Sequence, residues 1–431
     1  MCAAMGEASS TDVAPFAAVQ RRTLHVLMAG QVLGSAALGS AFAVGSFIVT
    51  DILGSGRLGG IASAGFTLGA ALSSIPLSRL MARRGRRVGL QLGYALATLG
   101  GVVAVVGAQR AEIVVFLIGQ LLFGVGNASN LLARYAATDL AEPNHRSRAI
   151  STVLVCSTFG AILGPTLVAP AEHVAEWLGL YRYTGPYLFS TVFYIGAVVN
   201  IAVRLRPDPL AVAGRLLPPG AQAPPAPPIR HALRVISQRP LARLALTSNV
   251  ISQVTMVSVM TMTPLHMRDH GHESISQYVI ALHVGGMYAF SPLVGRFADR
   301  HGRLPAIFIA GATLLLACVL AALAADVPIA VFAALWALGL GWSFGLISGS
   351  ALLTESVPPA ERVAVQGSAD LIMSFCGAIA GFSSGFVREA WGFHTLANAG
   401  TLLAGALLVA AFAASRTARR ASEALAPSLG G

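Results

Sequence analysis

Residues 295–303 read Gly-Arg-Phe-Ala-Asp-Arg-His-Gly-Arg and lie between two long apolar runs. The runs cover residues 277–294 and 305–325, and each is close to the roughly 20 residues that a helix needs to cross a bilayer. The stretch between them holds one acid, three arginines and two glycines. It is therefore predicted to be a tight, cationic turn that joins two membrane helices.

A second copy of this turn lies half a chain earlier, which indicates an internal duplication. Three of its positions match at an offset of 217 residues: Arg83 with Arg300, Gly85 with Gly302, and Arg86 with Arg303. Asp299, in contrast, is matched by Ala82. Two further blocks recur at 216 or 217 residues: Thr138-Asp139, Pro143 and Arg146 return as Thr354-Glu355, Pro359 and Arg362, and Gly160–Gly164 returns as Gly377–Gly381. Two similar halves are typical of transporters whose substrate site lies between the repeats.

The composition is that of a membrane protein. Hydrophobic residues make up 55% of the 431 residues and charged residues only 11%, whereas soluble proteins carry about 25% charged residues. The net charge of +11 comes from arginines that lie between apolar runs, so it indicates membrane orientation and no nucleic-acid partner. All 29 basic residues are arginine. Without lysine, the chain has neither a Walker A loop nor a lysine Schiff base.

Twelve apolar runs follow one another, and they predict an all-α membrane protein with two six-helix bundles. The runs cover residues 23–49, 58–80, 88–108, 112–137, 149–168, 186–203, 241–266, 276–298, 305–325, 328–353, 363–387 and 395–414. The predicted parts are an N-terminal tail (1–22), a first bundle (23–205), a linker (206–239), a second bundle (240–414) and a C-terminal tail (415–431). The linker is rich in proline and arginine, which favours an extended chain that lies on anionic lipid headgroups.

The arginines also predict the orientation in the membrane. With the N-terminus in the cytoplasm, 24 of the 29 arginines fall in cytoplasmic segments. The outside segments hold five: Arg57, Arg110, Arg182, Arg268 and Arg388. The positive-inside rule therefore places both termini and both glycine turns in the cytoplasm.

This organisation resembles the major facilitator superfamily over nearly the whole chain. The most specific part of the resemblance is the Gly-x-x-x-Asp-Arg-x-Gly-Arg turn formed by Gly295, Asp299, Arg300, Gly302 and Arg303. The resemblance implies alternating access, in which two six-helix bundles rock around a central site.

The chain departs from the family pattern at three positions. Ser78 and Ala82 stand in the first-half turn where the pattern has glycine and aspartate. In the fourth predicted helix, Gln120 occupies the place of the arginine that usually precedes a glycine, here Gly124, by four residues.

Gly160, Gly164 and Pro165 in the fifth predicted helix resemble the antiporter motif of the drug:proton exporters. The two glycines share one face of the helix and let a neighbour approach closely, and the proline bends the helix. The pair of glycines that usually follows is replaced by Val168-Ala169-Pro170. Two interpretations stay open, an exporter signature and ordinary packing of small residues.

Three charged or titratable side chains fall within predicted helices, where such groups are costly and often functional. Asp370 either carries the coupled proton or accepts hydrogen bonds from the opposite half near the inner gate. His283 titrates near neutral pH, and its alternative role is a hydrogen bond that supports packing. Arg134 either attracts an anionic substrate or extends to the cytoplasmic interface, and we expect the latter.

In the family that the chain resembles, helices 1, 4, 7 and 10 line the cavity. Here these helices offer mainly neutral amides, thioethers and indoles, which suit varied apolar ligands. The candidate lining residues are Gln31, Asn127, Asn130, Arg134, Asn249, Gln253, Met256, Met260, Trp336 and Trp342. Simple packing is the alternative for each. The four cysteines show no metal or redox spacing, so no metal site, disulfide or cofactor is predicted.

We therefore expect a proton-coupled secondary exporter of small, fairly hydrophobic compounds that acts as a monomer in a prokaryotic inner membrane. Within transport, the alternative is a proton-coupled importer of a neutral or weakly acidic metabolite. Outside transport, the degraded first turn suggests a transport-dead sensor or scaffold. An enzyme is not expected, because the sequence offers no nucleophile–base pair and no phosphate loop.

Asp299 is expected at the C-terminal end of its helix, where the helix dipole disfavours a carboxylate by roughly 0.3–1 kcal/mol. It should therefore contact Arg303 or the free N–H groups near Ser147 to Ile150, at the start of the fifth helix. The latter contact joins the two halves and forms only while the cytoplasmic side is closed. The matching contact of the first half lacks its acid at Ala82, so closure should depend mainly on Asp299.

Overall fold

The computed structural model describes residues 10–54, 60–214, 229–323 and 327–425, and within these ranges it contains helices and no strand. The first half contains α1 (Ser10–Leu53), α2 (Gly60–Arg84), α3 (Arg86–Gln109), α4 (Ile113–Ala136), the 3-10 turn η2 (Pro143–His145), α5 (Arg146–Leu154), α6 (Cys156–Thr166), α7 (Val168–Trp177) and α8 (Thr184–Arg204). Two short helices follow, α9 (Pro209–Val212) and α10 (Ile229–Ser237). The second half contains α11 (Pro240–Asp269), α12 (Glu273–Tyr288), α13 (Ser291–His301), α14 (Arg303–Leu323), α15 (Pro328–Ser356) and α16 (Arg362–Leu425).

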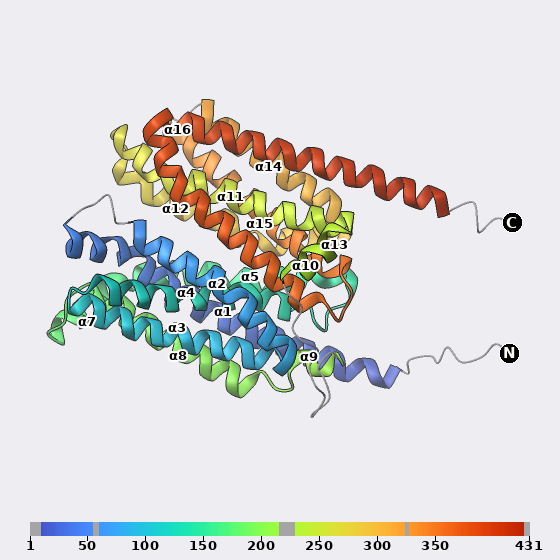
Figure 1. The fold of residues 1–431 in the computed structure, drawn as a ribbon, viewed down its shortest axis with the longest axis horizontal. Helices are drawn as coiled ribbons and strands as arrows, with labels where there is room; N and C mark the ends of the chain where they lie inside the picture. The colour runs from blue at the N-terminus through green and yellow to red at the C-terminus, as the bar shows by residue number, and fades with distance from the viewer. Residues whose placement is uncertain (1–9, 55–59, 215–228, 324–326, 426–431) are drawn as a thin grey trace.

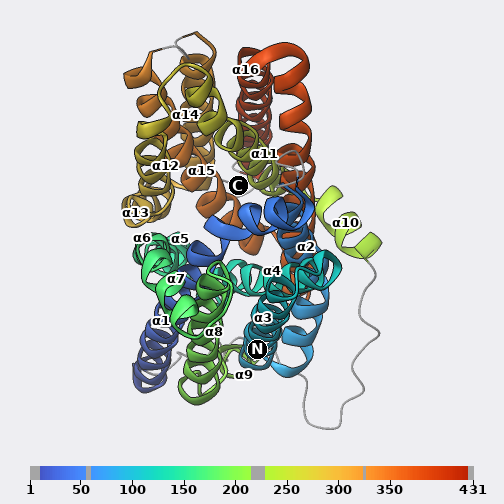
Figure 2. The same ribbon diagram turned by 90° about the vertical axis from the view of Figure 1, so that its left-hand side faces the viewer.

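The helices form two bundles that lie side by side, α1 to α8 in one and α11 to α16 in the other (Figures 1 and 2). Each bundle has its own apolar core. The cores exchange a few residues, because Ile150 and Leu154 of α5 pack into the second core and Val363 of α16 packs into the first. The two halves therefore interlock through α5 and the start of α16.

The described helices account for the twelve predicted membrane crossings. Ten stretches of the described residues are long and apolar enough to cross a membrane, and α2, with 25 residues, is not among them. The stretch Arg362–Arg416 of α16 has 55 residues, or roughly 80 Å of helix, enough for two crossings. Gly392, at φ 84°, interrupts this helix, and the chain turns back there (Figure 1). The protein is thus a multi-pass, all-α membrane protein, as predicted.

Two crossings are broken into shorter helices. The fifth crossing is interrupted at Val155 and again at Leu167, after which α7 extends beyond the predicted end at residue 168. Pro170 is tolerated there because it is the third residue of α7, where a backbone N–H has no partner within the helix. The eighth crossing is divided between α12 and α13, and Pro292 lies in the first turn of α13.

The predicted tails and linker are more helical than expected. Residues 10–22 belong to α1, and the Gln20 side chain donates a hydrogen bond of 2.8 Å to the carbonyl of Ala137. In the linker, residues 229–237 form the amphipathic helix α10 instead of an extended chain. Its buried side holds Ala232, Val235 and Ile236. These lie three or four residues apart, and this spacing favours a helix packed on a neighbour. The Pro-rich part, 215–228, Arg57 and the tail ends 1–9 and 426–431 lie outside the described residues.

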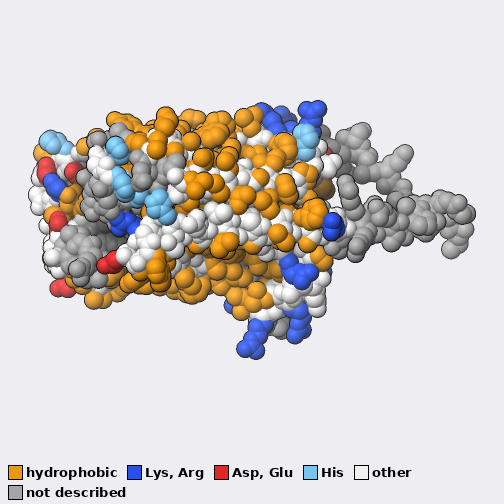
Figure 3. Space-filling view, turned by 90° about the horizontal axis from the view of Figure 1, so that it is seen from above, with side chains coloured by type: hydrophobic (Ala, Val, Ile, Leu, Met, Phe, Trp, Pro, Cys, Tyr) orange, Lys and Arg blue, Asp and Glu red, His pale blue; other side chains and the backbone are white. Residues whose placement is uncertain are grey.

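Arginines gather at one end of the molecule, and hydrophobic side chains cover the middle (Figure 3). This arginine-rich end contains the α2–α3 turn, the α13–α14 turn, α9 and α10 (Figure 1). The start of α1 and the end of α16 also lie on this side (Figure 1).

Candidate functional site

Asp299 joins the two halves at the arginine-rich end. Its carboxylate accepts hydrogen bonds from the backbone N–H groups of Ser147 (3.1 Å) and Arg148 (2.8 Å). These residues are in the first turn of α5, where N–H groups have no partner within the helix and the dipole favours an anion. Asp299 also forms an ion pair of 2.8 Å with Arg303, so it makes both of the contacts expected for it.

Arg303 extends the same junction. Its guanidinium pairs with Glu355 at 2.9 Å and donates to the carbonyl of Pro143, in the other half, at 2.6 Å. Gly302 has φ 96°, which allows the sharp turn from α13 into α14. Arg300 is exposed and takes no part in this network.

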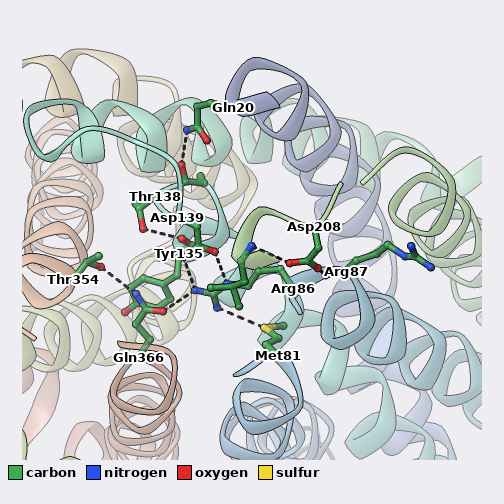
Figure 4. Close-up of polar contacts among 12 residues, drawn as sticks. Gln20, Met81, Arg86, Arg87, Tyr135, Thr138, Asp139, Asp208, Thr354 and Gln366 are labelled. Carbon is green, nitrogen blue, oxygen red and sulfur yellow. Dashed lines mark hydrogen bonds and ion pairs between the residues drawn. The ribbon is translucent and has the colours of Figure 1, made fainter. Parts of the chain in front are cut away.

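Arg86 occupies the equivalent place in the first half (Figure 4). It is buried, donates two hydrogen bonds to Asp139, at 2.8 and 3.2 Å, and reaches Gln366 of the second half at 3.0 Å. The preceding turn again uses a glycine with positive φ, Gly85 at 95°. The carboxylate of Asp208 caps α3 by accepting from the N–H of Arg87 at 2.8 Å. Arg83, like Arg300, is exposed.

The departure at Ser78 is matched on the facing helix. In the second half, Gly295 of α13 lies against Ser151 of α5, and a Cβ at Gly295 would overlap that serine. In the first half, Ser78 of α2 lies against Gly367 of α16, and a Cβ at Gly367 would overlap Ser78. The glycine and the serine are therefore exchanged between the facing helices. The second half has glycine on α13 and serine on α5, whereas the first half has serine on α2 and glycine on α16. The first-half junction therefore keeps its close helix contact although its sequence motif is degraded.

This exchange makes a testable prediction. Gly367→Ala should destabilise the protein by about 1–3 kcal/mol, the usual cost of overpacking, and adding Ser78→Gly should recover most of the loss. Gly405→Ala is the matched control on α16, because a Cβ there has open space around it. Thermal unfolding of the purified variants measures the difference, and equal effects at Gly367 and Gly405 would contradict the packing argument.

Arg134 and Asp370 form a buried ion pair between the halves. Their side chains are 0% and 1% exposed and meet at 2.5 Å, from α4 and α16 respectively. Arg134 also donates to Ser350 of α15 at 3.0 Å and to the carbonyl of Leu131 at 2.6 Å. The expectation that Arg134 extends to the interface is wrong, because Asp370 and Ser350 hold its guanidinium inside the protein.

Asp370 thus accepts a hydrogen bond from the opposite half, as one of its two interpretations required. Only one of its two carboxylate oxygens has a partner among the described residues. Its Oδ1 accepts from Arg134, whereas Oδ2 is buried without a hydrogen-bond partner among the described residues.

His283 lies elsewhere, in α12 facing α15. Its Nδ1 is 2.8 Å from the carbonyl of Leu335, and Nε2 is buried without a partner among the described residues. A Cβ at Gly339 would overlap the backbone of His283, so the two helices are in close contact there. This position favours a packing role inside the second half.

Two of the cavity candidates on α11 and α15, Gln253 and Trp342, are in direct contact. Trp342 donates to the Oε1 atom of Gln253 at 2.8 Å, and its ring meets Tyr288 edge-on with centroids 5.6 Å apart. Asn249 is one helical turn before Gln253, and both polar atoms of its amide are buried without a partner among the described residues. Trp336 meets Phe290 edge-on, and Met256 is buried.

The candidates from the first half are more fully engaged within their own bundle. Gln31 donates to Ser157 at 2.8 Å, and Asn130 accepts from the Tyr94 hydroxyl at 2.8 Å. Asn127 is half-buried on α4. Oε1 of Gln31 and Nδ2 of Asn130 are buried without a partner among the described residues. Both halves therefore offer amides with a free hydrogen-bonding atom.

The antiporter-like glycines bring α6 against α1. A Cβ at Gly160 would overlap Ser35, and one at Gly164 would lie 2.7 Å from the Cα of Gly39. Both contacts lie within the first bundle. They agree with the interpretation of these glycines as ordinary packing of small residues. The side chain of Pro165 lies outside the described residues.

Sequence reasoning missed Ser350, Gln366 and Asp208. Gln366 precedes Asp370 by four residues on an otherwise apolar helix, a spacing that places both on one face. Asp208 precedes Pro209, and an acid before proline at a helix start is a capping signal. Ser350 had no comparable signal. Within the described residues, no group of three or more His, Cys, Asp or Glu side chains is arranged to hold a metal ion.

Comparison with known proteins gives consistent matches along the chain. The model of the Major Facilitator Superfamily matches residues 26–282 and 246–428. The uncharacterized MFS-type transporter YdeG of Bacillus subtilis is 38% identical over 385 residues, which is 89% of each chain. The riboflavin transporter RfnT of Brucella anthropi is 29% identical over 386 residues, 88% of this chain and 92% of that protein. The structure of the human organic anion transporter MFSD10 matches with a TM-score of 0.70 at 17% identity, over 92% of this chain and 99% of that one.

Proposed function

The chain belongs to the Major Facilitator Superfamily, and we propose that it exports small, fairly hydrophobic compounds in exchange for protons by alternating access. In this proposal it works as a monomer in the plasma membrane of a bacterium, with the arginine-rich end in the cytoplasm. The excess of arginine at that end supports the orientation. The bacterial relatives support the location.

The buried pair Arg134–Asp370 is the observation that carries the coupling. In the present state it holds the cytoplasmic side closed, because its two charges come from different halves. A proton that reaches Asp370 from the outside neutralises the carboxylate and weakens its pair with Arg134, so the cytoplasmic side opens. Asp370 then releases this proton to the cytoplasm, and the charged carboxylate pairs with Arg134 again when the cytoplasmic side closes around the substrate.

The cluster around Trp342 and Gln253 supports an uncharged, partly aromatic substrate. The indole N–H occupies the amide oxygen of Gln253, so the amide nitrogen is the part that can donate to a ligand. Tyr288 supplies further aromatic surface against the Trp342 ring. Such a lining binds flat, weakly polar molecules better than phosphates or dicarboxylates.

A second candidate function is uptake of a neutral or weakly acidic metabolite. The similarity to a riboflavin transporter favours it, since that relative is matched over almost its whole length. The packing role of Gly160 and Gly164 also leaves the direction of transport open to this alternative.

Transport into membrane vesicles of both orientations separates the two candidates. For export, dyes should accumulate in inside-out vesicles with an acidic interior, and a protonophore should abolish the accumulation. Riboflavin uptake into right-side-out vesicles, without dye accumulation in the others, would replace export by import. Transport of neither class would favour a sensor or scaffold.

The coupling residue is tested with Asp370→Asn. This variant should lose gradient-driven accumulation but keep downhill exchange of substrate, because it preserves the shape and polarity of the side chain and removes the titrating group. His283→Gln is the control and should retain coupling. Uphill transport by the asparagine variant would remove Asp370 from the proton path, and selective loss in the glutamine variant would assign coupling to His283.

A further inference from the structure

An apolar groove of about 400 Å³ lies on the outer face of the second half, between α14 and the last part of α16. Its lining residues are Leu304, Pro305, Phe308, Ile309, Ala411, Phe412 and Ser415. Ser415 donates to the carbonyl of Phe412 in its own helix, at 2.7 Å. Its hydroxyl proton is thus already used, and the lining is otherwise hydrophobic.

The position of the groove in the membrane follows from the helix ends. Leu304 and Pro305 belong to the first turn of α14, which starts at the arginine-rich end. Phe308 and Phe412 are 47% and 51% exposed, so they present large apolar surfaces to the surroundings. On a membrane-spanning bundle these surroundings are lipid chains, and the depth corresponds to the leaflet at the arginine-rich end.

A cation stands beside this groove. The guanidinium carbon of Arg416 lies 4.4 Å from the centre of the Phe412 ring, and the side chain is exposed. Stacking uses the face of the guanidinium and leaves its N–H groups, which lie in the plane, available to an anion. Arg300 and His301 are also exposed and immediately precede α14. Figure 3 views the molecule from the side of α14 and α16, with the basic side chains at the arginine-rich end.

We propose that this groove binds one acyl chain of an anionic phospholipid whose phosphate pairs with Arg416. An apolar groove within one leaflet suits a lipid chain, and a basic residue at its headgroup end selects for negative charge. A transported compound fits less well, because the groove lies outside the bundle and offers no free donor from Ser415. The lipid would hold α14 against the end of α16 and thereby support Arg303, the first residue of α14.

Native mass spectrometry of the full-length protein in detergent tests the proposal with two lipids of identical acyl chains. Phosphatidylglycerol should bind more tightly than phosphatidylcholine. Arg416→Ala should weaken binding of phosphatidylglycerol about fivefold, the factor expected for one basic residue near an anionic headgroup, and leave phosphatidylcholine unchanged. Ser415→Trp should fill the groove and weaken binding of both lipids, because Ser415 is only partly buried.

Arg84→Ala is the matched control, because Arg84 is exposed at the same end but belongs to α2. It should not change lipid binding. If Arg416→Ala and Arg84→Ala weakened binding of phosphatidylglycerol equally, the effect would come from general surface charge and not from a site at Arg416. If both lipids bound with equal affinity, the groove would not select an anionic headgroup. If Ser415→Trp converted a dimer into a monomer, the groove would be a protein interface instead. Unchanged thermal unfolding of each variant excludes loss of the fold as the cause.

Discussion

Arg134→Met is expected to destabilise the closed state by about 3–5 kcal/mol, because it leaves Asp370 charged and buried without a partner. Arg134 and Asp370 are almost inaccessible to solvent, so water does not screen the loss. The substitution also removes the bonds of Arg134 to Ser350 and to the carbonyl of Leu131.

The protein can avoid this cost by separating the halves at the arginine-rich end. Moving a two-state equilibrium from 1:99 to 99:1 requires about 5.5 kcal/mol. The expected destabilisation of the closed state is therefore large enough for most of such a shift towards the open state. The measurement is labelling of a Leu154→Cys reporter in a cysteine-free background, since Leu154 of α5 is buried against the apolar core of the second half in the closed state. Labelling should become much faster in Arg134→Met.

The double variant Arg134→Met/Asp370→Leu is the control. It removes both charges, and well-packed apolar replacements of a buried pair are often neutral or stabilising. Labelling should therefore return towards the rate of the unmodified protein. If the double variant opened as readily as Arg134→Met, the shape of Arg134 and its bond to Ser350 would matter more than the compensation of charge.

The fold was largely predictable because hydrophobicity along the chain reports membrane crossings directly. Runs of about 20 apolar residues give the crossings, and the offset of 217 residues between Arg86 and Arg303 gives the two halves. Even the contact of Asp299 with α5 follows from local rules, since an acid at a helix C-terminus needs a partner and a helix N-terminus provides one.

The contacts that were not predictable depend on pairing between distant residues. Arg134 and Asp370 are 236 positions apart, and nothing in either segment identifies the other. The exchange between Ser78 and Gly367 is visible only when α2 and α16 face each other. The helix α10 was missed because the proline-rich segment before it dominated the composition, although Ala232, Val235 and Ile236 have helical spacing.

Asp299→Asn is expected to shift the population towards the state that is open at the arginine-rich end and to remove most of the transport rate. The asparagine loses the charge that interacts with the α5 dipole and with Arg303, and it keeps one acceptor for two N–H groups. The loss of such a helix cap costs about 0.5–2 kcal/mol, or roughly a 2- to 30-fold change in the ratio of the two states. Arg303 retains its bonds to Glu355 and Pro143, so the junction weakens without disappearing.

Ala82→Asp is the opposite test, on the first-half junction. The residues equivalent to Ser147 and Arg148 are Val363 and Ala364, in the first turn of α16, where backbone N–H groups again lack partners in the helix. A carboxylate introduced at position 82 should bind them and slow labelling of the Leu154→Cys reporter, whereas Asp299→Asn should accelerate it. Because Ser78 and Gly367 already bring α2 and α16 into close contact, only the charge is missing on this side. Unchanged labelling in both variants would show that Asp299 only stabilises the turn, and that closure depends on Arg134 and Asp370.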